Sequence, residues 1–305
     1  MASPDPPYPA ILSASRRTDI PAFYLDWFMA GIDRGAFEVE NPYNRRRREV
    51  PARPHEVHSI VLWSKNFGPF LDRKIGEKLE RRGYRLFFNF TINSTAPALE
   101  PHVPPLTNRL AQLKELAARF GAHILFWRFD PVCFYRCKPA ATPTDNLGEL
   151  ATIAATAAGA GVKQCITSFV DLYPKVQQRA RRAGIHFEDP STATKVHLLK
   201  RMAGALRDRG IGLSTCCENQ TRPHLKPADG IQSGACIPGE RLARLYGDHL
   251  NLKRDRGQRV KAGCGCNLSI DIGSYQRQPC YHDCLFCYAR PQAPRNTPAA
   301  NGPEV

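Results

Sequence analysis

Short apolar runs recur along the chain and predict buried strands. They are rich in β-branched and aromatic residues and are almost continuously hydrophobic. This is typical of parallel strands that are buried on both faces, whereas strands with one wet face alternate. The runs span 10–15, 58–63, 85–91, 123–129, 164–170 and 211–215.

Segments with a helical spacing of apolar residues separate these runs. The apolar side chains of 106–120 share one face, and Gly121 follows as a stop. Pro21 suits the first turn of a helix over 21–34, Asp145 is a candidate N-cap for 145–160, and a fourth helix is predicted over 191–209. The alternation predicts an α/β fold, a partial TIM-like (β/α) barrel of about six parallel strands. A closed eight-stranded barrel and a doubly wound sheet are the alternatives.

The character of the chain changes after residue 215. Cysteines become frequent, Gly and Pro increase, and the periodicity fades. We therefore predict the barrel in 1–215 and a Cys-rich metal-binding region in 216–290 that packs on it. The polar, Pro- and Ala-rich residues 291–305 are predicted to be a disordered tail.

Composition narrows the class of protein. The 305 residues are 42% hydrophobic, which is enough for a substantial core, and no apolar run reaches membrane-spanning length. The first residues lack the pattern of a secretory signal, so we expect a cytoplasmic protein whose cysteines bind metal rather than form disulfides. The formal net charge of +15, with Arg45–Arg48 as its densest run, suits a nucleic acid partner. The favoured alternative is an arginine-rich surface without a binding face.

Polar residues follow each predicted strand. The carboxyl ends of barrel strands meet on one rim, where barrel enzymes hold their substrates. Cations there can bind a carboxylate or phosphate, and carboxylates can orient the cations or bind ribose hydroxyls. A buried ion pair between Arg128 and Asp130 is the alternative for those two. The candidates for catalysis are Lys65, Arg128 and Asp130, and the candidates for cofactor binding are Arg17, Asp19, Asn89 and Glu218.

Three late cysteines have the spacing of an iron–sulfur motif. Cys280, Cys284 and Cys287 form C-x3-C-x2-C, with Phe286 before the last cysteine. Three thiolates on a cubane cluster leave one iron without a protein ligand, and such an iron can act on a substrate or cofactor. Zinc is the alternative, with His282 or Cys266 as a fourth ligand, but zinc sites favour paired C-x2-C knuckles.

A second set of cysteines precedes this triplet. Cys217, Cys236, Cys264 and Cys266 could hold a second iron–sulfur cluster or a structural zinc, with the adjacent Cys216 as a rival for Cys217. The spacing does not choose between the two metals. The remaining cysteines, Cys133, Cys137 and Cys165, are expected to be small buried hydrophobes or loop residues.

The triplet resembles the cluster motif of the radical SAM superfamily. That resemblance implies a 4Fe–4S cluster whose free iron binds S-adenosylmethionine (SAM). Reductive cleavage of SAM then yields a radical that abstracts hydrogen from a substrate. It also implies a TIM-like barrel and a reductant such as a flavodoxin or ferredoxin. The substrate stays open and could be a small molecule or a macromolecule.

The whole chain is more similar to one bacterial family, a domain of unknown function with radical-SAM-like cysteines at its C-terminus. The similarity spans nearly the full length. It rests on SASRRTDIPAF (13–23), NPYN (41–44), VLWSKN (61–66), WRFDPV (127–132), SFVDLY (168–173), STCCEN (214–219), ACI (235–237) and CGCNLSIDIGSY (264–275).

The chain departs from the usual radical SAM pattern in two ways. The cysteine motif normally follows the first strand, but here it comes last, as after a circular permutation. The Gly-Gly-Glu run expected after the second strand is replaced by Ser64-Lys65-Asn66. Three functions therefore compete: a radical SAM-like enzyme, a nucleic-acid-binding or repair protein with an iron–sulfur cluster, and a zinc-stabilised barrel with ordinary polar catalysis.

Overall fold

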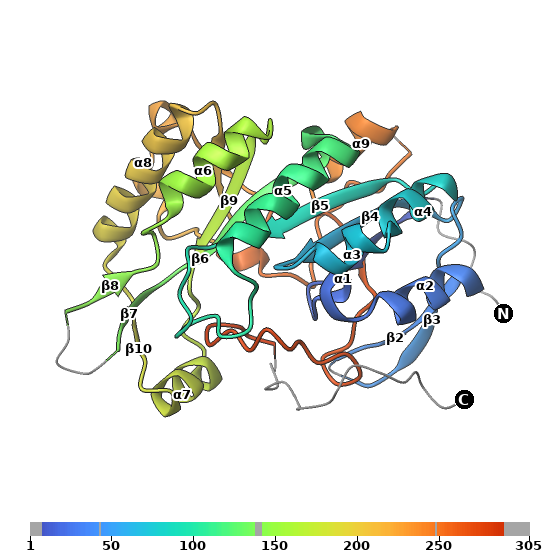
Figure 1. The fold of residues 1–305 in the computed structure, drawn as a ribbon, viewed down its shortest axis with the longest axis horizontal. Coiled ribbons are helices and arrows are strands. Elements are labelled where there is room, and N and C mark those ends of the chain that lie inside the picture. The colour runs from blue at the N-terminus through green and yellow to red at the C-terminus, as the bar shows by residue number, and fades with distance from the viewer. Residues whose placement is uncertain (1–7, 43, 138–141, 248, 290–305) are drawn as a thin grey trace.

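A parallel sheet of eight strands forms the centre of the molecule (Figure 1). The computed structural model describes residues 8–42, 44–137, 142–247 and 249–289. The strand order is β12-β11-β9-β6-β5-β4-β1-β13, and every neighbouring pair is parallel. The two edge strands do not pair with each other in this part of the chain, so the sheet is an open, TIM-barrel-like arrangement.

The six predicted strands are all present and lie side by side in their sequence order, which confirms the predicted α/β fold. The predicted ends differ from the observed ones by at most three residues; the largest difference is at 123–129, where residues 122–124 form a 3-10 turn before the strand. The observed strands are β1 (Ala10–Ala14), β4 (Val57–Ser64), β5 (Leu86–Thr91), β6 (Leu125–Val132), β9 (Gln164–Phe169) and β11 (Gly212–Thr215).

Two short strands of the Cys-rich region extend the sheet at both edges. β12 (Ile231–Ser233) pairs with β11, and β13 (Ile270–Asp271) pairs with β1, where Ile270 lies opposite Leu12. Strands this short have no hydrophobic pattern to reveal them. The residues after 215 thus complete the sheet as well as carrying the cysteines. The predicted tail 291–305 lies outside the described residues.

The four predicted helices are all present; 106–120 has the predicted ends, and the ends of the other three differ. The segment 21–34 divides at Tyr24 into two helices, and 145–160 begins later because the Asp145 side chain instead accepts a bond from the Leu147 N–H. Ser191 caps the last helix through the Thr194 N–H. The observed helices are α1 (Ile20–Phe23), α2 (Leu25–Arg34), α5 (Leu106–Phe120), α6 (Leu150–Gly159) and α8 (Thr192–Arg207).

Other elements were not predicted because they are short or polar. The described residues contain four further α-helices, of which α7 packs on β10, and two small antiparallel sheets separate from the central one. They are the helices α3 (Gly68–Asp72), α4 (Ile75–Arg81), α7 (Pro174–Arg182) and α9 (Gly239–Tyr246), the hairpin β2 (Ala36–Glu40) with β3 (Arg47–Pro51), and the strands β7 (Phe134–Arg136), β8 (Thr144–Asp145) and β10 (His186–Glu188).

Aromatic side chains fill the core on both faces of the central strands. Phe87, Phe88 and Phe90 of β5 are fully buried, and Trp127 of β6 is buried with its indole N–H bonded to the Ile92 carbonyl. Adjacent residues of one strand point to opposite faces, so both faces are covered. This explains why the strands read as continuous apolar runs.

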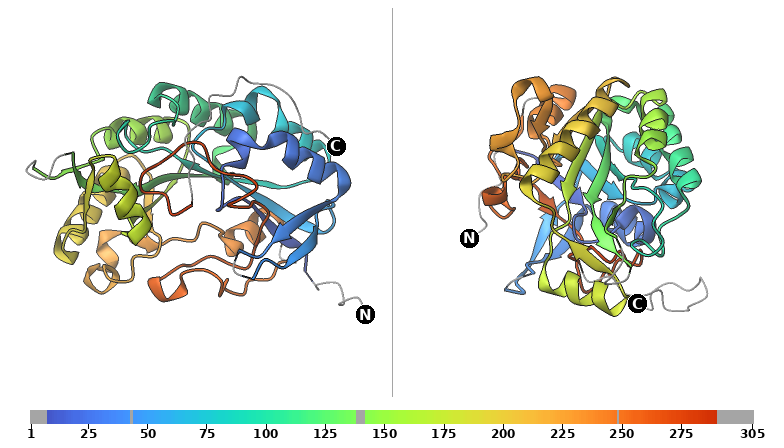
Figure 2. Two further views of the ribbon diagram at one scale, coloured as in Figure 1. Left: turned by 90° about the horizontal axis from the view of Figure 1, so that it is seen from below. Right: turned by 90° about the vertical axis from the view of Figure 1, so that its left-hand side faces the viewer.

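The last described segment runs across the carboxyl ends of the strands. In Figure 1 it passes between α7 and the β2–β3 hairpin, and the view from below in Figure 2 shows it crossing the middle of the molecule. The cysteine triplet lies in this segment. The fold therefore brings the end of the described chain to the rim on which the sequence predicts a site.

A buried histidine in β4 gives the stability of the fold a pH dependence. Burial lowers the pKa of His58, the Gly247 carbonyl opposes this through a 3.1 Å bond, and Arg85 and His249 lower it further. The neutral ring therefore stabilises the fold fully above pH 6.5, and this contribution is lost as the pH falls below that value. We expect His58→Gln to lose less free energy of unfolding than the wild type between pH 7 and pH 5, measured by urea denaturation. An equal loss in both proteins would contradict this.

Candidate functional site

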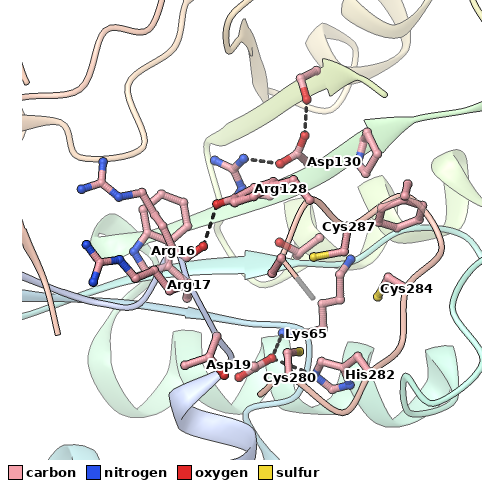
Figure 3. A pocket seen from close by; sticks show the side chains of 18 of the residues that line it. Arg16, Arg17, Asp19, Lys65, Arg128, Asp130, Cys280, His282, Cys284 and Cys287 are labelled. Carbon is pink, nitrogen blue, oxygen red and sulfur yellow. Dashed lines mark hydrogen bonds and ion pairs between the residues drawn. The ribbon is translucent and has the colours of Figure 1, made fainter. Parts of the chain in front are cut away.

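A cavity of about 240 Å³ opens at the carboxyl ends of the central strands. Its walls come from residues at the carboxyl ends of β4, β5, β6 and β9, from the segments after β1, β4 and β9, from Arg259 and from the last described segment. Figure 3 shows the cysteine triplet on one side of this cavity and Arg16 and Arg17 on the other. Residues more than 200 positions apart in sequence thus share one cavity, because parallel strands bring their carboxyl ends to the same rim.

The three cysteines of the triplet all line this cavity. Cys284 is buried, and Cys280 and Cys287 are half-buried. The pKa of Cys280 is raised to about 12, by burial first and then by Asp19 and Cys287, and burial raises the pKa of Cys284 well above its usual range although Lys65 opposes this. Buried thiols of this kind become thiolates when a bound metal centre compensates their charge. The donor set therefore fits a cationic cofactor that contacts all three.

Asp19 joins the triplet loop to the barrel. Its carboxylate accepts bonds from the Ala22 N–H at the start of α1, from the Ser64 hydroxyl and from the Lys65 N–H at the end of β4. Its second oxygen lies 2.8 Å from Nε2 of His282, which is inside the triplet and is buried. The carboxylate therefore fixes three segments at once.

Further bonds hold the backbone of the triplet loop. Arg179 of α7 donates to the carbonyls of Leu285 and Cys287, and the Leu285 N–H donates to Leu99. The Tyr24 hydroxyl donates to the Pro279 carbonyl just before Cys280. A loop that is tied from several elements can hold its cysteines in a fixed arrangement.

Lys65 lies beside the triplet as half of a buried ion pair. Its ammonium is 2.6 Å from Oε1 of Glu100 and 5.3 Å from the centre of the Phe286 ring. Burial lowers the pKa of Lys65, but Glu100 and then Cys284 outweigh it, so the pKa ends above its ordinary value. Lys65 therefore keeps its positive charge next to the thiols.

Arg128 and Asp130 form the ion pair that the sequence left as an alternative, and both line the cavity. Asp130 also accepts a bond from the Ser168 hydroxyl, and Arg128 lies 5.2 Å from the centre of the Trp63 ring. Burial raises the pKa of Asp130, but Arg128 and then Ser168 outweigh it, so the pKa ends below its usual range. Both side chains are thus ionised and line the cavity. Their ion pair is therefore compatible with a role of Arg128 and Asp130 at the site.

The other predicted binding residues divide into two groups. Arg17 and Asp19 line the cavity; Arg17 donates to the carbonyls of Glu40 and Gly273. Asn89 and Glu218 are not among its walls. Asn89 lies within β5 and donates to the Cys236 carbonyl, and Glu218 accepts a bond from the Phe169 N–H. The structure therefore does not bring these two to the cavity.

The second set of cysteines gathers around a neighbouring cavity of about 360 Å³, whose walls include all five thiols and also Arg128 and Asp130. Sγ of Cys216 lies 3.6 Å from Sγ of Cys217 and 3.7 Å from that of Cys236. The five are Cys216, Cys217, Cys236, Cys264 and Cys266. Outside both groups, Cys133 and Cys165 are buried, as expected, and Cys137 is exposed.

Both cysteine groups are consistent with a metal or iron–sulfur site. Within the described ranges, no group of three or more His, Cys, Asp or Glu side chains is arranged to hold a single metal ion. A mononuclear zinc site is therefore not preformed there. The arrangement does not identify the cofactor.

The basic run predicted to suit a polyanion lies on the β2–β3 hairpin. Arg45 to Arg48 are exposed, and Arg45 and Arg47 pair with Glu40, while Arg47 also pairs with Glu38. Part of the positive charge is thus neutralised on the protein itself, and binding of nucleic acid stays a prediction.

Several residues of the site were not found from the sequence. Arg16 pairs with Asp271 of β13, Glu100 pairs with Lys65, and Arg179 donates to the triplet loop. Two residues carried a signal. Arg16 follows the first predicted strand, and His282 lies inside the triplet, where the sequence favoured it as a residue behind the ligands or on the surface. The burial of His282 against Asp19 supports the first of these.

None of the described helices is long and apolar enough to cross a membrane.

Comparison with known proteins identifies the family of this chain. No curated protein matches the chain. Among solved structures, a D-hydantoinase from a Bacillus sp. AR9 is similar with 13% identity and a TM-score of 0.34, over 61% of this chain and 40% of the hydantoinase. The chain thus spans less than half of that protein, and similarity at this level says nothing about activity. Residues 11–289 match the family described as Domain of unknown function (DUF1848), and the chain therefore belongs to that family.

Proposed function

We propose that this protein is an iron–sulfur enzyme of the radical SAM type. One observation carries the proposal: the last described segment places Cys280, Cys284 and Cys287 on the rim of the parallel sheet, in the wall of the cavity that Lys65 and Asp130 also line. When bound there by three thiolates, a 4Fe–4S cluster would keep one iron for SAM and would supply the electron for its cleavage.

The strand order supports a permuted relative of the radical SAM barrel. β13 precedes the triplet and pairs with β1 at the edge of the sheet. Counted from β13, the strands follow one another across the sheet in the order β13-β1-β4-β5-β6-β9-β11-β12. The cysteine motif then follows the first strand, which is its usual place in the superfamily. This removes the first of the two departures seen in the sequence.

The residues of the cavity have distinct roles in the proposal. Asp19 and His282 keep the triplet loop in place, since they join it to the ends of β1 and β4. Lys65 places a positive charge beside the thiols, which offsets the negative charge of thiolate ligands and can hold the carboxylate of SAM. The Arg128–Asp130 pair presents an ionised edge on the other side, where it can orient a polar substrate.

Cleavage of SAM tests the proposal. We expect the anaerobically reconstituted protein to form 5′-deoxyadenosine from SAM when dithionite, or a reduced flavodoxin or ferredoxin, is present, and none without a reductant. Lys65→Ala should raise the KM for SAM by about 10- to 100-fold, because a buried charge-assisted contact is lost. Lys78→Ala, which changes an exposed lysine in the middle of α4 outside the cavity, is the matched control. Protein that carries its cluster but yields no 5′-deoxyadenosine would contradict the proposal.

A further inference from the structure

Five cysteine thiols meet on the far side of Arg128 from the triplet. They come from three parts of the chain: Cys216 and Cys217 follow β11, Cys236 follows β12, and Cys264 and Cys266 precede β13. Both edges of the sheet thus contribute to one group. The radical chemistry proposed above gives these thiols no task.

We propose that this group holds a second iron–sulfur cluster, with Cys236, Cys264, Cys266 and one of the adjacent pair as ligands. Cys216 is the better placed of the pair, because it is buried and its sulfur lies near those of both Cys217 and Cys236. This inference does not depend on the proposed function, since the second cluster has its own ligands.

The number of thiols and the size of the cavity that they line favour a cluster over a single ion. Two sulfur separations, 3.6 and 3.7 Å, are close to the edge of a zinc tetrahedron with bonds of about 2.3 Å. However, no three suitable side chains in the described ranges are arranged around one ion. All five thiols instead line a cavity of about 360 Å³, whereas one water takes only about 30 Å³. Five donors around such a space suit a polynuclear centre.

The backbone is shaped to bring the thiols together. A side chain at Gly265 would meet the Gly234 carbonyl at 2.8 Å, so glycine at 265 lets the segments that carry Cys236 and Cys264 touch. The Ile237 N–H also points at Cys266 Sγ, at 3.4 Å. Backbone N–H groups of this kind stabilise ligand thiolates and tune cluster potentials. The close approach of the segments that carry these thiols is therefore a property of the backbone.

Four arginines line the cavity of this group. Arg128 donates to Cys236 Sγ, and Arg16, Arg17 and Arg259 line the same cavity. Their charges offset the negative charge that four thiolates bring to a cluster. Arg128 also pairs with Asp130, and both line the triplet cavity too. The second cluster thus borders the reaction cavity, and Arg128 lies between the cluster and that cavity. Arg128 is a positioning residue that sets the reduction potential of the second cluster.

Metal content separates the two sites. After anaerobic reconstitution, the triple variant Cys280→Ala, Cys284→Ala, Cys287→Ala should keep roughly four irons and four sulfides per chain, about half of the wild-type content. The variant Cys236→Ala, Cys264→Ala, Cys266→Ala should lose the iron and sulfide of the second cluster and keep those of the triplet. Cys137→Ser, which changes an exposed cysteine outside both groups, is the control and should match the wild type. Zinc without sulfide, or no metal, in the first variant would overturn the second cluster even if SAM cleavage is found in the wild type.

The potential of the second cluster tests Arg128. The variant without the three triplet cysteines contains only the second cluster. In that variant, Arg128→Met should lower the midpoint potential of the second cluster, measured by a redox titration followed by electron paramagnetic resonance. Loss of a neighbouring positive charge disfavours the reduced cluster. Arg128→Lys keeps the charge and should stay close to the parent. An unchanged midpoint potential in Arg128→Met would contradict the role of Arg128. If Arg128→Met loses the cluster, comparison with Arg128→Lys shows whether that loss comes from misfolding.

Discussion

Replacing Cys284 with alanine is expected to abolish cleavage of SAM and to remove the iron of the triplet. Cys284 is the buried member of the three and lies beside Lys65 and Glu100. Loss of a residue that only supports a ligand typically weakens a metal site by about 10- to 100-fold, so loss of a ligand itself should reduce activity by at least about 100-fold. The rate of 5′-deoxyadenosine formation and the iron content per chain measure the effect.

The control for this prediction is Cys133→Ala. Cys133 is buried in the same small apolar cluster as Cys284 but does not line the cavity. It should keep its iron and its activity, although its fold will lose some stability. Wild-type activity in Cys284→Ala would refute the role of the triplet, because no thiol of the described chain from outside the triplet lines that cavity to replace it.

Replacing Asp19 with alanine is expected to destabilise both the fold and the site. The change removes the cap of α1, the bonds from Ser64 and Lys65, and the partner of His282. The expected loss in the free energy of unfolding is about 3 to 5 kcal/mol, since a cap contributes about 1 kcal/mol and buried donors left without a partner cost more. Chemical denaturation under anaerobic conditions measures it.

Asp26→Ala is the matched control, because Asp26 is an exposed acid that pairs with Arg73 on the next helix. Exposed pairs contribute about 1 kcal/mol or less. Asp19→Ala should also release iron from the triplet faster than the wild type on exposure to a chelator. If the two variants lost equal stability and released iron equally fast, Asp19 would not be the link between the barrel and the loop.

The sheet could be predicted from the sequence because its central strands are buried on both faces. Segments 58–63 and 123–129 contain runs of consecutive apolar residues, at 60–63 and 124–127, and that pattern has few alternatives at this length. The edge strands β12 and β13 could not be predicted. They have three and two residues, and only their neighbours in the sheet define them. The permuted position of the cysteines therefore became understandable only once β13 was placed beside β1.

The site could be predicted in part. The spacing of Cys280, Cys284 and Cys287 is a local property, and the rim position of Lys65 and Asp130 follows from the strand ends. Glu100 and Arg179 carry no local signal, since their roles depend on contacts across the fold.

Asn89 and Glu218 show the limit of reading strand ends. Asn89 lies within its strand rather than beyond it, and Glu218 turns to the backbone of the neighbouring strand at Phe169. A polar residue near the end of a strand can face either way, and the sequence does not say which.

The most direct test of the account is the electron paramagnetic resonance spectrum of the reduced protein with and without SAM. The variant Cys236→Ala, Cys264→Ala, Cys266→Ala isolates the triplet. The account predicts a 4Fe–4S signal in this variant whose g-values shift when SAM is added, because SAM binds the iron that no cysteine holds. A signal that SAM leaves unchanged, or the absence of any cluster in this variant, would contradict it.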